Sequence, residues 1–92
     1  MTILHSQTYD REGNDAWLND KIQIIQEDGG LILRHKINHN GWNGEIKKTL
    51  EIDLEEYDSI EDKQKRVQEY MESELLLPEM TVPNLSELIN GN

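Results

Sequence analysis

A four-residue stretch, Glu27-Asp28-Gly29-Gly30, constrains the fold more than any other part of the sequence. It lies between two segments rich in aliphatic residues. Its Asp-Gly and Gly-Gly pairs supply the positive φ angles that a two-residue primed turn requires. Because such a turn joins neighbouring antiparallel strands, we expect a β-hairpin centred on this stretch.

The residues before the turn carry a mixed signal. Apolar residues over 15–26 lie near helical spacing, so a helix remains open as an alternative there. Three β-branched isoleucines run straight into the turn, however, and these residues favour a strand. We therefore expect a strand over residues 21–27, with residues 16–20 leading into it.

Further strands are expected on both sides of this hairpin. Residues 2–9 are rich in Thr, Ile and Tyr, residues 31–37 alternate after the turn, and polar glycine-containing turns are expected at 10–15 and 39–44. The clearest alternation runs over residues 45–55, which indicates one buried and one wet face. The expected buried face has one charged member, Lys48, and otherwise consists of Ile46, Leu50, Ile52 and Leu54.

An amphipathic helix is expected after this strand, over residues 59–76. Asp58 is a suitable N-cap, because Glu61 follows it at the capping-box spacing. Pro78 then ends regular structure. The apolar residues on one helical stripe are Ile60, Val67, Met71 and Leu75.

Together these segments predict a single α+β domain over residues 1–77. We expect a three- to four-stranded antiparallel β-meander followed by one amphipathic α-helix packed on one sheet face. Residues 78–92 are expected to form a Pro-interrupted C-terminal tail, with room for one short helical turn at 84–89.

The absence of certain residues and segments excludes several classes of protein. With no cysteine, the chain has no disulfide framework, no thiol nucleophile and no Cys-ligated metal site. The N-terminal residues lack the basic and apolar regions of a secretory signal, and the longest apolar run is three residues. We therefore expect a cytoplasmic protein that does not enter a membrane.

No catalytic signature is present, and we expect a protein that is not an enzyme and needs no cofactor or metal. His35 and His39 have the spacing of two metal ligands on a helix face, but on a strand they stand about 13 Å apart. No serine lies in a nucleophile-elbow motif, and the glycines do not form a phosphate-binding loop. The histidines are therefore interpreted as structural or solvent-exposed.

The negative charge is concentrated in the second half of the chain. The formal net charge is −10, yet residues 1–50 contribute only −1 and residues 51–92 contribute −9. Within 51–62 there are seven carboxylates and no base: Glu51, Asp53, Glu55, Glu56, Asp58, Glu61 and Asp62. Acids at such short spacing repel one another at physiological salt, so stability alone does not explain the row.

Two interpretations of this row remain open. It is either a solvated surface that keeps the protein soluble, or a surface that binds a partner. In the second case we expect the seven carboxylates to form the main contact, with Glu69 and Glu72 peripheral. Trp42, in a glycine-flanked turn, would then be an apolar anchor.

In size, acidity and lack of cysteine, the chain resembles phage-encoded inhibitors of host defence, such as DNA-mimicking anti-CRISPR or anti-restriction proteins. The resemblance implies an inhibitor that occupies the basic groove of a nucleic-acid-handling protein. Direct nucleic-acid binding is not expected, because neutralising phosphates requires clustered Lys and Arg. The alternative is a small adaptor, antitoxin, immunity or assembly subunit that acts through its C-terminal tail or a sheet edge, with a homodimer left open.

Overall fold

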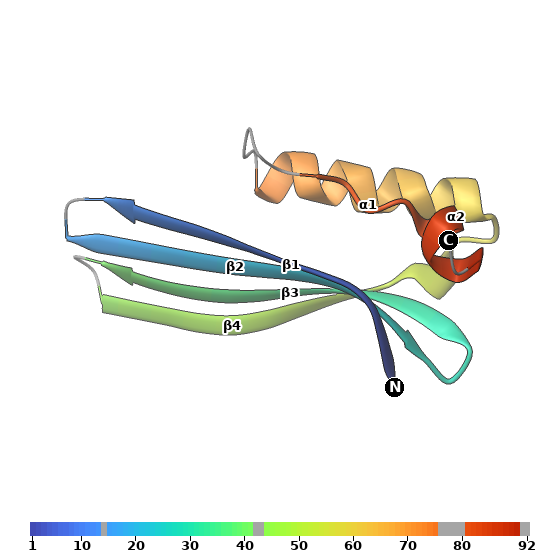
Figure 1. The fold of residues 1–92 in the computed structure, drawn as a ribbon, viewed down its shortest axis with the longest axis horizontal. Helices are drawn as coiled ribbons and strands as arrows, with labels where there is room; N and C mark the ends of the chain where they lie inside the picture. Colours follow the sequence, from blue (N-terminus) through green and yellow to red (C-terminus); the bar gives the residue numbers. More distant parts are fainter. Residues whose placement is uncertain (14, 42–43, 76–80, 91–92) are drawn as a thin grey trace.

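The computed structural model describes residues 1–13, 15–41, 44–75 and 81–90 of the 92-residue chain. Four long strands form one antiparallel sheet in the order β1-β2-β3-β4, and Figure 1 shows helix α1 lying over one face of it. The expected α+β meander with one helix on one sheet face is confirmed. The elements are β1 (Thr2–Gly13), β2 (Ala16–Glu27), β3 (Gly30–Gly41), β4 (Gly44–Asp53), the 3-10 helix η1 (Leu54–Glu56), α1 (Ile60–Glu74) and α2 (Leu85–Asn90).

The turn between β2 and β3 forms as the sequence predicts. Asp28 and Gly29 occupy its two central positions with φ angles of 53° and 81°, and Glu27 pairs with Gly30. Positive φ at both positions is the hallmark of the primed turns that match the twist of the flanking strands. This turn aligns every cross-strand pair between β2 and β3.

The strands are longer than expected, and two of the expected turns are shorter. Residues 10–13 and 39–41 were assigned to turns from their polar composition, but they belong to β1 and β3. Residues 16–20 are part of β2 and not a lead-in, so the strand interpretation of 16–26 is correct and the helical alternative is wrong. Cross-strand hydrogen bonding sustains these polar ends, since each one pairs with a neighbouring strand in continuous register.

The core lies between α1 and one face of the sheet, which we call the helix-side face. Ile22, Ile24 and Leu33 come from this face, and each is at most 1% exposed. From the helical layer Val67 and Met71 pack against them. The opposite face, which we call the open face, is defined by Lys21, Gln23, Arg34 and Lys36, the residues that alternate with the core positions of β2 and β3.

The helix begins one residue later than expected. Ser59, not Asp58, is the N-cap, and its Oγ accepts a hydrogen bond from the backbone N–H of Asp62. The extended backbone of Ser59 brings its short side chain onto the first turn, as an N-cap requires. The apolar stripe is confirmed and is widened by Tyr70, which is 7% exposed.

The C-terminal segment packs against α1. Leu85 is fully buried in the core, and the Gln64 side chain bonds both the carbonyl of Pro83 and the N–H of Leu85. The short helical turn that the sequence allowed at 84–89 is therefore present as α2. Among the described residues, neither helix has the length and apolar character needed to cross a membrane.

One expectation about β4 is wrong. Its alternating residues were expected to give a buried face, but Ile46 and Leu50 are 54% and 38% exposed. Leu50 pairs with His35, which α1 covers, and is exposed because β4 is an edge strand of the sheet. Ile46 lies farther along, where a difference in length decides: a 15-residue helix spans about 22 Å, whereas a 12-residue strand spans about 40 Å. Helix α1 therefore covers the half of the sheet that contains Ile52, and leaves the far half of the helix-side face uncovered.

A matched pair of substitutions tests this partial coverage. Leu33→Ala removes a side chain that is 1% exposed and is expected to lower the free energy of unfolding by about 3 kcal/mol. Leu50→Ala, on the same sheet face but on the edge strand β4, is expected to cost less than about 1 kcal/mol. Urea unfolding followed by circular dichroism measures both values, and equal losses would contradict the partial coverage.

Candidate functional site

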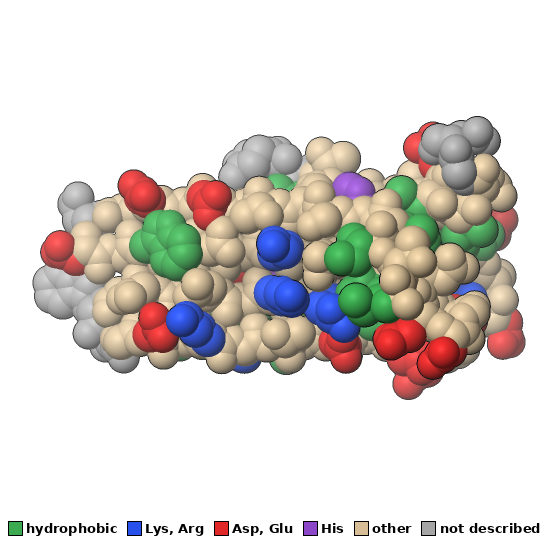
Figure 2. All heavy atoms as spheres, turned by 60° about the horizontal axis from the view of Figure 1, so that its bottom comes forward, with side chains coloured by type: hydrophobic (Ala, Val, Ile, Leu, Met, Phe, Trp, Pro, Cys, Tyr) green, Lys and Arg blue, Asp and Glu red, His purple; other side chains and the backbone are tan. Residues whose placement is uncertain are grey.

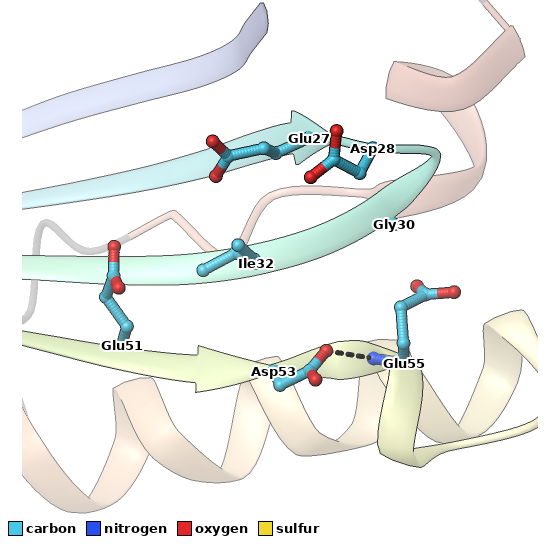
Figure 3. A pocket seen from close by; sticks show the side chains of 7 residues that line it. All are labelled: Glu27, Asp28, Gly30, Ile32, Glu51, Asp53 and Glu55. Carbon is cyan, nitrogen blue, oxygen red and sulfur yellow. Dashed lines mark hydrogen bonds between the residues drawn. The ribbon is translucent and has the colours of Figure 1, made fainter. Parts of the chain in front are cut away.

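Five carboxylates converge at the end of the sheet where β2 turns into β3. They line a hollow of about 380 Å³, with Gly30 and Ile32 at its floor (Figure 3). The β3–β4 register causes this convergence, because it places Asp53 opposite Ile32, next to the turn. We call this site the acidic hollow, and its carboxylates are Glu27, Asp28, Glu51, Asp53 and Glu55.

Glu55 is held firmly in this hollow. Its Oε2 accepts hydrogen bonds from the N–H of Leu31 and from Nζ of Lys63, each at 3.0 Å. These bonds favour the ionised form, the backbone bond most of all, and they lower the pKa of Glu55 below its ordinary value. Gly30 is needed for this approach, because a Cβ there would lie 2.7 Å from Cγ of Glu55.

Glu51 and Asp53 are also bonded within the protein. Oε2 of Glu51 lies 2.7 Å from Nε of Arg34 on the neighbouring strand. Asp53 caps η1 by accepting a hydrogen bond from the N–H of Glu55. In contrast, Glu27 and Asp28 form no side-chain hydrogen bond or ion pair with other described residues. They are the two acids of the hollow without a bonded partner among the described residues.

The expected row of seven carboxylates is divided by the fold. Glu51 lies on the open face of the sheet, whereas Glu61 and Asp62 are exposed on α1, which covers the other face. Glu56 and Asp58 are exposed in the connection between them. Glu69 and Glu72 continue the exposed surface of α1 and do not reach the hollow, and Trp42 lies outside the described residues.

Sequence reasoning missed the partners of this row. The segment 51–62 contains no base, but Arg34 neutralises Glu51 from β3 and Lys63 neutralises Glu55 from α1. Figure 2 shows that Lys and Arg side chains gather in the middle of the open face, while acidic side chains lie toward both ends of the molecule, most densely at one of them. Lys63 follows the row directly in the sequence, so its pairing with an acid of the row could have been predicted. The pairing of Arg34 with Glu51 could not, because it depends on the register between β3 and β4.

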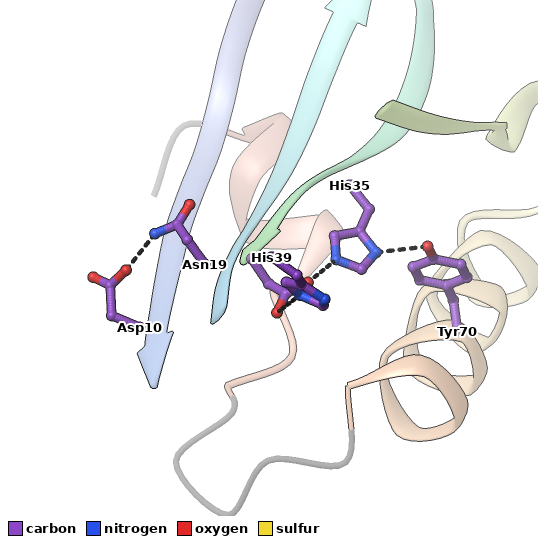
Figure 4. A network of polar contacts seen from close by, with 6 residues as sticks. Asp10, Asn19, His35, His39 and Tyr70 are labelled. Carbon is purple, nitrogen blue, oxygen red and sulfur yellow. Dashed lines mark hydrogen bonds and ion pairs between the residues drawn. The ribbon is translucent and has the colours of Figure 1, made fainter. Parts of the chain in front are cut away.

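A second polar cluster is buried between the sheet and α1 (Figure 4). Asp20 is 3% exposed, and its two oxygens lie 2.8 Å from Nε2 of His35 and 3.0 Å from Nε2 of His39. Nδ1 of His35 lies 2.8 Å from the hydroxyl of Tyr70. Asp20 pairs with Ile37, midway between the two histidines, so both rings reach one carboxylate despite their separation along β3.

The hydrogen bonds of this cluster are mutually consistent. Asp20 accepts from both Nε2–H groups, which leaves Nδ1 of His35 to accept from the hydroxyl of Tyr70. Burial, followed by the nearby charge of Glu74, raises the pKa of Tyr70 to about 12, so its hydroxyl remains a donor. The described residues contain no group of three or more acids and histidines placed to bind a metal.

Comparison of the chain with protein-family models, with curated protein sequences and with solved structures found no match. The proposed function therefore rests on the geometry of the described residues.

The lowered pKa of Glu55 predicts a pH-dependent contribution to stability. Its bonds stabilise the folded state above the ordinary pKa of 4.5, and this stabilisation is lost as the pH falls through the lower pKa of the folded state. Glu55→Gln should therefore unfold at lower urea concentration than the wild type near pH 7, and the difference should shrink as the pH falls below 4.5. Glu56→Gln, an exposed neighbour, should differ little from the wild type over the same pH range.

The buried cluster predicts a cost for removing one hydroxyl group. Tyr70→Phe leaves Nδ1 of His35 buried without a partner and should lower the free energy of unfolding by about 1–3 kcal/mol. Tyr57→Phe is the matched control, because its hydroxyl bonds no described residue, and it should change stability by less than about 0.5 kcal/mol. If Tyr70→Phe left the free energy of unfolding unchanged, the hydrogen bond to His35 would contribute nothing to stability.

Proposed function

We propose that this chain is a non-enzymatic protein-binding inhibitor that places its acidic hollow against basic side chains of a nucleic-acid-handling protein. The observation that supports this proposal is the convergence of five carboxylates from the β2–β3 turn, β4 and η1 on one hollow. These carboxylates are far apart in the sequence, and the fold brings them together where like charges repel.

The hollow suits a cationic side chain in shape and in charge. Its volume of about 380 Å³ lies within the range of pockets that enclose small ligands. An Arg guanidinium binds carboxylates in a bidentate manner, and Glu27 and Asp28 are the acids without an internal partner. Their position on a tight turn restricts their motion, so little conformational entropy is lost when a partner binds.

The long-range field favours the same kind of partner. A net charge of −10 attracts a basic surface and accelerates encounter, and the exposed acids of α1 extend this field beyond the hollow. Proteins that bind nucleic acid carry such basic grooves. By occupying the groove, the carboxylates would replace phosphates and exclude the nucleic acid.

The adaptor alternative has less support among the described residues. Docking through the edge of β4 is opposed by Lys47 and Lys48, since charged side chains on an edge strand discourage pairing with another strand. The start of the tail, residues 76–80, lies outside the described residues.

Charge variants of the full chain test the proposal. A partner is first captured from an extract of the source cells at low salt, identified by mass spectrometry, and its affinity measured by interferometry. The double variant Glu27→Lys, Asp28→Asn should weaken binding at least about 30-fold, the loss of about 2 kcal/mol expected when close charge pairs are broken. Asn is chosen at position 28 because it tolerates the positive φ angle.

The double variant Glu69→Lys, Glu72→Gln is the control, because it changes the net charge equally on the outer face of α1. It should weaken binding only a few fold, and both variants should retain the wild-type circular dichroism spectrum. The captured protein should also bind nucleic acid and release it when the chain is added. Equal effects of the two double variants, or binding that is insensitive to salt, would refute the proposal.

A further inference from the structure

A second hollow lies on the helix-side face of the sheet, beyond the C-terminal end of α1. Its volume is about 210 Å³. It contains Lys48, the one charged residue on the otherwise apolar face of β4, and the exposed edge of the buried histidine cluster. The lining residues are Arg11, Asp20, His35, Ile37, His39, Ile46, Lys48 and Glu74.

The strand register explains why these residues meet. Arg11 pairs with Leu18, Leu18 with His39, and His39 with Ile46, which forms one row across all four strands. In the adjacent row, Asp20 pairs with Ile37 and Ile37 with Lys48. Two cations from the opposite edge strands therefore share one face and one hollow with His39. The last residue of α1, Glu74, borders this hollow.

His39 is held in a fixed orientation at this hollow. Its Nε2 is bonded to Asp20, which is 3% exposed and bonded in turn to His35, while 29% of the His39 side chain remains exposed. Burying a carboxylate is costly, and an apolar cluster of similar shape commonly stabilises a fold as well or better. Packing alone therefore does not account for the buried Asp20. We interpret it as the group that holds the ring of His39 in position at the hollow.

The donors left free in the hollow belong to cations. Arg11 and Lys48 form no ion pair with other described residues, so their donors are available in the hollow. The two carboxylates of the lining are Asp20 and Glu74, and both oxygens of Asp20 accept hydrogen bonds from histidines, so only Glu74 presents free acceptors beside the two cations. The side chains of Ile37 and Ile46 provide an apolar wall beside these charged groups.

We propose that this hollow binds a small oxyanion, a phosphate or carboxylate group, between Arg11, Lys48 and His39. The guanidinium and the ammonium group donate charge-assisted hydrogen bonds to such a group, and the imidazole of His39, whose Nε2–H donates to Asp20, lines the hollow beside them. The isoleucines contact the carbon portion of a ligand that carries the oxyanion. This site is separate from the acidic hollow and opposite to it in charge preference, so each proposal can fail without the other.

Titration of the full chain with inorganic phosphate, and separately with acetate, tests the proposal. Ionic strength is held constant with sodium chloride, and the histidine ring and arginine side-chain signals are followed by 15N-edited NMR. Saturable shifts of the Arg11 and His39 signals are expected, with a dissociation constant of about 1 mM or lower for the preferred anion. Response to phosphate alone assigns a phosphate group, and response to both anions assigns a general oxyanion site.

Two neighbouring lysines provide a matched control. Lys48→Gln should weaken binding at least about tenfold, whereas Lys47→Gln, with the same charge change on the opposite face of β4, should leave it unchanged. Glu74→Gln should tighten binding, because it removes the opposing charge. If Lys48→Gln alters the fold, Arg11→Gln tests the same site independently and should also weaken binding.

Three results would each overturn the proposal. The first is the absence of saturable shifts with either anion, and the second is equal effects of Lys47→Gln and Lys48→Gln. The third is weaker anion binding by Glu74→Gln, because removing a carboxylate beside a bound anion should only strengthen its binding. None of these measurements depends on a protein partner, so they do not bear on the acidic hollow.

Discussion

The difference in length between the strands and the single long helix determines how the rest of this molecule is arranged. A 15-residue helix can cover only about half of a sheet built from 12-residue strands. The covered half holds the core, and the uncovered half leaves Ile46 exposed in the lining of a hollow. Both candidate binding sites lie where the helix does not reach: one beyond its C-terminal end and the other on the open face.

The buried cluster around Asp20 joins the two layers at the border of this coverage. Tyr70 from α1 bonds His35, and Asp20 then links His35 to His39, which is partly exposed. Both oxygens of Asp20, both ring nitrogens of His35 and the hydroxyl of Tyr70 have partners, which is the condition under which a buried polar network is stable. It therefore ties the position of the helix to the orientation of a histidine at the surface.

Much of the fold follows from local signals along the chain. The Asp28-Gly29 turn, the alternation of the strands and the apolar stripe of α1 each depend on residues close in sequence, and each is confirmed. The errors arose where a local signal competes with tertiary structure. Polar residues 10–13 are held in β1 by pairing, and the alternation of β4 does not predict burial, because burial depends on where α1 ends.

The sequence by itself determined the hairpin, the order of the elements and the concentration of acids after residue 50, because these depend on composition and short-range geometry. Only the tertiary structure decided which charges meet. Glu51 is paired with Arg34, Glu55 with Lys63, and Asp20 with two histidines, all through contacts between residues distant in sequence. The register of the strands and the length of α1 set these contacts, so the row of acids became two surfaces and Lys48 became part of a hollow.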